Sequence, residues 1–158
     1  MNTPTQNKRL IFTDQKGNLN FVIPSPNFKG SMEELRHKLT IQDQIDSVDE
    51  INIIDIADVP KERVFRNAWK KGSGGKRIDI DLPKAKTIAH GFRRIKRKKE
   101  LNPLDEEVTM NHANPAKLNV SEAKRQVIRD KYVTIQNNID ACDNVDDLQN
   151  IVNAEGLI

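Results

Sequence analysis

Residues 84–99, KAKTIAHGFRRIKRKK, decide how the second half of this chain folds. At about 100° per residue, a helix through this stretch gathers its apolar side chains on one side. Those side chains are Ala85, Ile88, Phe92 and Ile95. The opposite side carries Lys86, His90, Arg93, Arg94 and Arg97. The pattern predicts an amphipathic basic helix that begins near Lys84.

This helix lies in a basic block between two acidic ones. Residues 61–99 carry 15 Lys and Arg against 3 Asp and Glu, a net charge of +12. Residues 1–60 carry 6 against 9, and residues 100–158 carry 5 against 11, so their net charges are −3 and −6. The overall charge of +3 therefore hides one concentrated cationic segment, which is where we look for a partner.

Seven cations of the helix are the candidate partner-binding residues: Lys86, Arg93, Arg94, Lys96, Arg97, Lys98 and Lys99. Three interpretations stay open. The cations form a solvated face, stabilised by the helix dipole and neutralised by the acidic residues that follow; or they bind phosphate backbones; or they dock onto an acidic protein surface. No aromatic residue interleaves on the basic face, so the sequence gives no support to base stacking.

Upstream of the basic block, the sequence predicts a small antiparallel sheet. Two apolar runs, 10–12 and 19–23, flank a polar turn in which Gly17 is available for positive φ, which indicates a β-hairpin. Ser31 followed by Glu34 forms a capping box for a short helix. The isoleucine-rich run at 51–56 then favours a third strand.

Between the sheet and the basic helix, we expect a helix begun at Asp58, with the only tryptophan, Trp69, on its apolar stripe. The run KGSGGK at 71–76 is expected to be a flexible hairpin tip, and it lacks the GxxxxGK[ST] spacing of a phosphate loop. The alternating residues 78–80 indicate a very short strand.

The last third predicts two helices joined at 140–143. One begins near Ser121 and carries an apolar stripe at spacings of 4, 3 and 4; the other is capped by Asn144 and ends at Gly156. The fold class is therefore α+β: a small N-terminal antiparallel β-sheet with a short helix, followed by a mainly helical C-terminal half that ends in an αα-hairpin. The expected segments are 1–60, 61–110 and 115–158. A chain of 158 residues is expected to form one main core.

No catalytic or metal-binding set is recognisable. Cys142 is the only cysteine and is interpreted as a packing residue or an idle thiol, and the three histidines fall in separate elements. Asp79 and Asp81 share one face of a strand and could hold a metal with a third ligand, but a helix cap and a solvated strand face explain them more simply. The sequence thus predicts a non-enzymatic protein without cofactor, metal, membrane span or small-molecule substrate, made in the cytoplasm.

Part of the chain resembles a pattern in small proteins of tailed bacteriophages and prophages. The resemblance rests on residues 58–60, the segment Val64-Phe65-Arg66-Asn67-Ala68-Trp69, residues 78–81, and Lys84, Ala85, Ile88, Arg94, Arg97, Leu104 and Asp105. The C-terminal helical hairpin also resembles the ends of phage tail-associated proteins, so that the likeness covers roughly residues 60–158. The resemblance implies a virion-associated or virion-assembly protein and implies no chemistry.

Two function hypotheses follow. In the first, the chain is a phage structural or assembly protein that docks onto other virion proteins, or onto a second copy, through the basic helix and the helical hairpin. In the second, it is a nucleic-acid-associated or host-directed regulatory protein that uses the basic helix on phosphates or on an acidic target. The first places the protein in the host cytoplasm and then in the virion.

Overall fold

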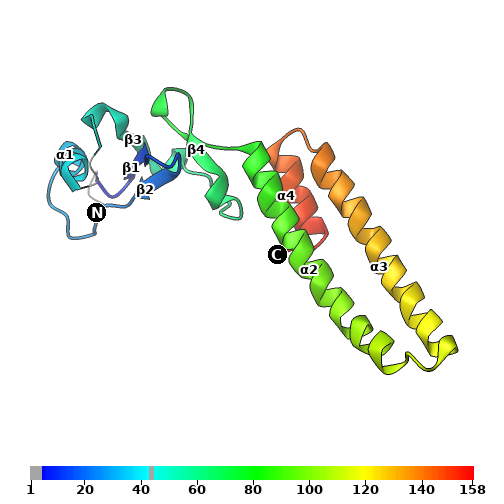
Figure 1. The fold of residues 1–158 in the computed structure, drawn as a ribbon. Coiled ribbons are helices and arrows are strands. Elements are labelled where there is room, and N and C mark those ends of the chain that lie inside the picture. Colours follow the sequence, from blue (N-terminus) through cyan, green and yellow to red (C-terminus); the bar gives the residue numbers. More distant parts are fainter. Residues whose placement is uncertain (1–4, 43–44) are drawn as a thin grey trace. The chain divides into compact units, whose positions relative to one another are not determined.

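The computed structural model describes residues 5–42 and 45–158, and it divides the chain into two compact units (Figure 1). Unit 1 is Met1–Asp81 and holds the strands; unit 2 is Leu82–Ile158 and holds the long helices. The expectation of one main core was wrong, because the long helices form a core of their own. The expected segment 61–110 is consequently divided between the two units.

Unit 1 is built on a three-stranded antiparallel sheet of β1 (Lys8–Thr13), β2 (Leu19–Val22) and β3 (Asn52–Asp55), in the order β2-β1-β3. The central strand places Ile11 opposite both Phe21 and Asn52. Gly17 has a φ of +79° in the turn between β1 and β2. The hairpin and the third strand predicted from the sequence are confirmed.

Both faces of the central strand β1 are buried, because alternate side chains of a strand point to opposite faces. Leu10 and Phe12 pack with Met32 and Leu39 of helix α1 (Met32–Gln42) on one face. Ile11 packs on the other face with a second cluster that consists of Ile54, Val59, Trp69 and Ile78. The continuous apolar run Leu10-Ile11-Phe12 thus joins the short helix and the second half of unit 1 to the two faces of the same sheet.

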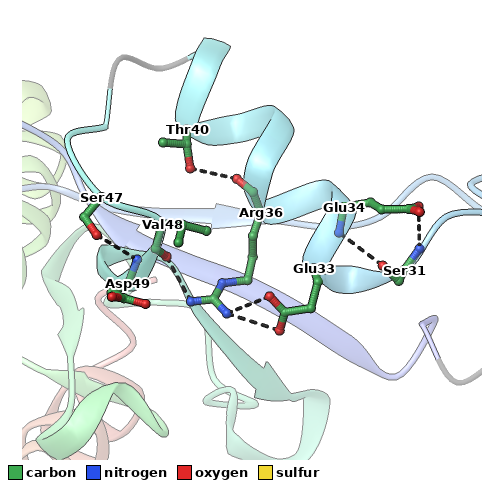
Figure 2. A network of polar contacts seen from close by, with 8 residues as sticks. All are labelled: Ser31, Glu33, Glu34, Arg36, Thr40, Ser47, Val48 and Asp49. Atoms are coloured by element: carbon green, nitrogen blue, oxygen red, sulfur yellow. Dashed lines mark hydrogen bonds and ion pairs between the residues drawn. The ribbon is translucent and has the colours of Figure 1, made fainter.

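Helix α1 (Met32–Gln42) begins with the predicted capping box (Figure 2). The Glu34 amide donates to Ser31 Oγ at 3.1 Å, and the Ser31 amide donates to Glu34 Oε2 at 3.0 Å. One turn on, Arg36 forms an ion pair with Glu33 at 2.8 Å and donates to the carbonyl oxygen of Val48 at 2.9 Å. Arg36 thereby links the helix to the segment that leads into β3.

The helix expected from Asp58 was wrong. Residues Arg66–Ala68 form a single 3₁₀ turn, and Trp69 opens a strand, β4 (Trp69–Lys71), which pairs with β5 (Ile78–Ile80). Phe65, Ala68 and Trp69 are buried as expected. The spacing of these residues suits a helix, but it suits a turn followed by a strand equally well. The pairing of Trp69 with Ile80 shows that the turn and strand are formed.

The glycine run forms the tip of this β4–β5 hairpin. Gly74 and Gly75 have φ values of +64° and +66°. Gly75 is buried, and a Cβ atom there would collide with the side chain of Asn52 in β3. The tip is therefore packed against the sheet at Gly75, while a Cβ atom at Gly74 would meet only the Lys76 side chain, at 4.0 Å.

Unit 2 consists of α2 (Leu82–Met110), α3 (Pro115–Ala141) and α4 (Val145–Ala154). Helices α2 and α3 form a long antiparallel hairpin, and the shorter α4 packs against both (Figure 1). Helix α3 begins earlier than the expected Ser121: Asn114 caps it by accepting from the Lys117 amide at 3.2 Å, and Pro115 occupies its first turn. The predicted cap of α4 is confirmed, since Asn144 Oδ1 accepts from the Asp147 amide at 2.8 Å.

The core of unit 2 lies where the three helices meet. It contains Ala85 and Ala89 of α2, Ile135 and Ile139 of α3, and Leu148 and Val152 of α4, all of them buried. Cys142 is also buried, which bears out its interpretation as a packing residue. No helix in the described part of the chain is long and apolar enough to cross a membrane.

Candidate binding surface on unit 2

The structure separates the seven candidate cations of α2 into two groups. Three of them bond to other parts of unit 2. Lys86 Nζ donates to the Asp140 carbonyl oxygen at 2.8 Å, and Lys96 Nζ donates to the carbonyl oxygens of Glu155, at 3.0 Å, and of Gly156. These two lysines tie α2 to the ends of α3 and α4.

The third member of this group, Arg93, is buried between α2 and α3 and is only 7% exposed. The sequence placed it on the solvent side of the helix and placed Ile95 in the core. The structure reverses both assignments, since Ile95 is exposed. Arg93 Nη1 donates to the Tyr132 carbonyl oxygen at 3.4 Å, and Arg93 Nε has no hydrogen-bond partner among the described residues.

No carboxylate pairs with Arg93 in the described structure. Burial lowers the pKa of its guanidinium, the neighbouring charges of Arg97 and Arg94 lower that pKa further, and Asp140 partly offsets them. The positive charges on this part of α2 therefore repel one another. An anionic surface that approached them would relieve this repulsion.

Four cations remain exposed: Arg94, Arg97, Lys98 and Lys99. None of them has a hydrogen bond or an ion pair with the described residues. Arg94, Arg97 and Lys98 stand at i, i+3 and i+4, so they share one side of α2, and we call these three residues the cationic ridge. Lys99 points to a different side of the helix, about 100° further round than Lys98.

A polar seam holds α2 to α3 and fixes the position of the ridge. His90 Nε2 lies 2.8 Å from Asp140 Oδ1, and Glu100 accepts from the Tyr132 hydroxyl at 2.7 Å and from Lys131 at 3.1 Å. Burial opposes the ionisation of Glu100, but the bonds from Tyr132 and Lys131 outweigh it and lower its pKa. The ridge thus stands on a helix whose rotation about its own axis is set by bonds to α3.

We did not predict the polar seam from the sequence, although the spacing of residues along α3 indicates an interface there. Along α3, residues 118, 121, 125, 128, 132, 135 and 139 alternate in steps of three and four, which is the spacing of a helix that packs along its whole length. Polar residues occupy some of these positions, among them Ser121, which donates to Glu107 at 3.0 Å. The polar positions therefore fall inside the helical interface.

The residues considered for catalysis or metal binding are engaged elsewhere. Asp79 pairs with Arg77 at 2.8 Å, and Asp81 lies 3.7 Å from Lys70. Burial raises the pKa of the Cys142 thiol. Among residues 5–42 and 45–158, no group of three or more His, Cys, Asp or Glu side chains is arranged to hold a metal ion.

A hollow of about 380 Å³ lies in unit 1, beside the turn between β1 and β2. Its lining includes Asp14, Asp46 and Glu50. Asp14 serves the turn itself, because its carboxylate accepts from the amides of Lys16 and Asn18, both at 2.9 Å. The hollow thus adds no independent sign of a ligand.

Comparison of the chain with known protein families, with curated proteins and with solved structures finds no match.

Proposed function

We propose that this protein is a non-enzymatic docking protein that binds an acidic surface of another protein through the cationic ridge of Arg94, Arg97 and Lys98. The observation that carries the proposal is the uncompensated charge of the ridge. The three side chains are exposed and lack acidic partners in the described structure, whereas the neighbouring cations Lys86 and Lys96 are bonded within unit 2. A helix that is anchored by bonds to α3 and to the end of α4 presents the ridge in a fixed orientation.

The geometry favours an acidic protein over nucleic acid. The ridge runs from residue 94 to residue 98, four steps along the helix, which is roughly 6 Å along its axis. Proteins that depend on phosphate contacts for DNA binding typically make about 6–10 of them. Unit 2 as a whole carries 13 Lys and Arg against 11 Asp and Glu, a net charge of +2, so its charge is distributed in patches and not in a continuous positive face. Patches of both signs suit a protein partner.

The partner we propose is a virion protein, met during assembly or in the finished particle. Support for this context comes from the resemblance to tailed-phage proteins, which includes two of the three ridge residues, Arg94 and Arg97. The long α2–α3 hairpin supports it as well, because it offers extended helical surfaces to a neighbour.

Fluorescence anisotropy of the full chain with a labelled poly-L-glutamate peptide, and separately with a DNA duplex of about 20 base pairs, tests the proposal. The ridge variant combines Arg94→Ala, Arg97→Ala and Lys98→Ala. The matched control combines Lys61→Ala, Arg63→Ala and Lys76→Ala, which removes the same charge from exposed positions of unit 1.

We expect the ridge variant to bind the acidic peptide about tenfold more weakly than the wild type, and the control variant to bind within about twofold of it. Equal losses of affinity in both variants would show that binding depends only on net charge, and would refute the ridge as the binding surface. Preferential binding of the duplex, lost in the ridge variant, would replace the proposed partner with nucleic acid.

A further inference from the structure

The far half of the α2–α3 hairpin has an uncovered apolar face. Helix α4 has 10 residues and α2 has 29, so α4 spans roughly a third of the length of α2. Its C-terminal end reaches α2 at Lys96, which bonds to Glu155 and Gly156. In Figure 1, α2 and α3 continue side by side well beyond this point.

Two adjoining hollows follow the hairpin beyond α4 and share Lys124 in their lining. The first has a volume of about 500 Å³, and Pro103, Leu104, Val127 and Ile128 form its apolar floor. The second has a volume of about 390 Å³ and includes Val120. We call the two hollows together the apolar groove.

The apolar groove continues the surface that α4 already covers. Pro103 follows Lys96 by seven residues, which is two helical turns, so the two residues point to the same side of α2. Val127, at the groove, is 69% exposed. An apolar face that is covered over one half of a hairpin and open over the other half is typical of a helical assembly that is completed by another subunit.

The charges along the edge of the apolar groove are complementary to the same edge of a second copy of the chain. Lys99 precedes Pro103 by four residues and Glu106 follows it by three, so both lie on the same side of α2 as Pro103. Both are exposed, and neither has an ion pair with the described residues. A two-fold axis that passes midway between them, beside Pro103, would place Lys99 of one copy opposite Glu106 of the other, and Glu106 opposite Lys99.

The same axis passes through the larger hollow. The ion pairs Glu100–Lys131 and Glu107–Lys124 fix the antiparallel register of the hairpin, and this register places Val127 and Ile128 at the level of residues 103–104. The apolar floor and the two residues of the charged edge, Lys99 and Glu106, are thus centred on the same point. A partner with only acidic or only basic residues would not match this mixed edge.

We propose that the apolar groove is the interface of a homodimer, in which two α2–α3 hairpins pack face to face with antiparallel α2 helices and form a four-helix bundle. The cationic ridge lies on a different side of α2, because Arg94 is half a turn away from Pro103 around the helix axis. The dimer therefore leaves the ridge free, and the proposal stands independently of the function proposed for the ridge.

Sedimentation equilibrium of the full chain across a concentration series tests the dimer. Val127→Glu places a charge in the interface, and Val133→Glu is the matched control, since Val133 is also an exposed valine of α3 but lies outside the groove lining. We expect Val127→Glu to weaken dimerisation at least about a hundredfold and Val133→Glu to change it less than about threefold. Circular dichroism checks that both variants keep the helix content of the wild type.

Charge exchange tests the two-fold arrangement itself. Lys99→Glu and Glu106→Lys, each alone, turn two attractions of the dimer into repulsions and should each weaken it about tenfold. The double variant restores the pairs and should return to within about threefold of the wild type, while Lys61→Glu, which makes the same change of charge at an exposed position of unit 1, serves as the charge-matched control. If the losses of dimer affinity in the two single variants add up in the double variant, the two-fold arrangement is wrong. A chain that stays monomeric up to about 1 mM would overturn the dimer and leave the groove to a different protein.

Discussion

Replacing Tyr132 by Phe isolates one bond of the polar seam. The ring of Tyr132 is 1% exposed and stays in place in Tyr132→Phe, so the variant removes only the hydroxyl that donates to Glu100 at 2.7 Å. A hydrogen bond to a charged group contributes about 1.5–3 kcal/mol. The Glu100 side chain is 29% exposed and keeps its contact with Lys131, so we expect a loss of about 1–2 kcal/mol in the free energy of unfolding.

The pH dependence of this loss follows from the pKa of Glu100, which is lower in the folded protein than in the unfolded chain. Stabilisation by a carboxylate of this kind is fully present above the unfolded pKa of about 4.3, and it is lost as the pH falls through the folded pKa. The difference between Tyr132→Phe and the wild type should therefore be largest near neutral pH and shrink in acid.

Urea unfolding followed by far-UV circular dichroism measures the loss in the helices, and fluorescence of Trp69 follows unit 1 separately. Glu100→Gln and the double variant complete a thermodynamic cycle, in which we expect a coupling of about 1 kcal/mol. An equal loss for Tyr132→Phe in the presence and absence of the Glu100 carboxylate, or a loss that is independent of pH, would refute this assignment of the seam.

Two further predictions concern local structure. Asn144→Ala removes the cap of α4 and should lower the free energy of unfolding by about 1 kcal/mol, whereas Asn150→Ala, inside the same helix and exposed, should change it by less than about 0.5 kcal/mol in the same urea experiment. Gly75→Ala should destabilise unit 1 by about 1–3 kcal/mol, as measured by Trp69 fluorescence during urea unfolding. Gly74→Ala should destabilise it less, because both glycines have positive φ but only at Gly75 does the new methyl group collide with Asn52.

The parts of the fold that could be predicted from sequence are those set by short-range chemistry. Gly17 supplies the positive φ of the first hairpin, and Ser31 and Asn144 cap the helices that follow them. Each of these signals acts within four residues, so the local sequence contains both partners of the interaction.

The parts that could not be predicted depend on partners distant in sequence. Trp69 fits a helical stripe, but its pairing with Ile80 makes it a strand residue. Arg93 is buried because the Tyr132 carbonyl oxygen, 39 residues away, accepts from it. Pro103 lies inside α2, and α2 pairs with α3 on both sides of it, through Glu100 and Lys131 and through Asp105 and Arg125.

The same limit applies to the candidate binding surface. The basic helix was predicted, but periodicity alone could not separate the ridge residues from Lys86, Arg93 and Lys96, because their partners come from α3 and from the end of α4. The apolar groove was not predicted either. Val127 and Pro103 are far apart in the chain, and only the antiparallel register of α2 and α3 brings them to one hollow.

The most direct test of the docking function is a nuclear magnetic resonance titration of the isotope-labelled full chain with the poly-L-glutamate peptide. We expect the largest amide shifts at residues 93–99, around Arg94, Arg97 and Lys98, and only small shifts at residues 61–77 of unit 1 despite their seven cations. Shifts that are spread over both basic segments, or centred on the apolar groove near Val127, would contradict the central claim that the cationic ridge is the docking surface.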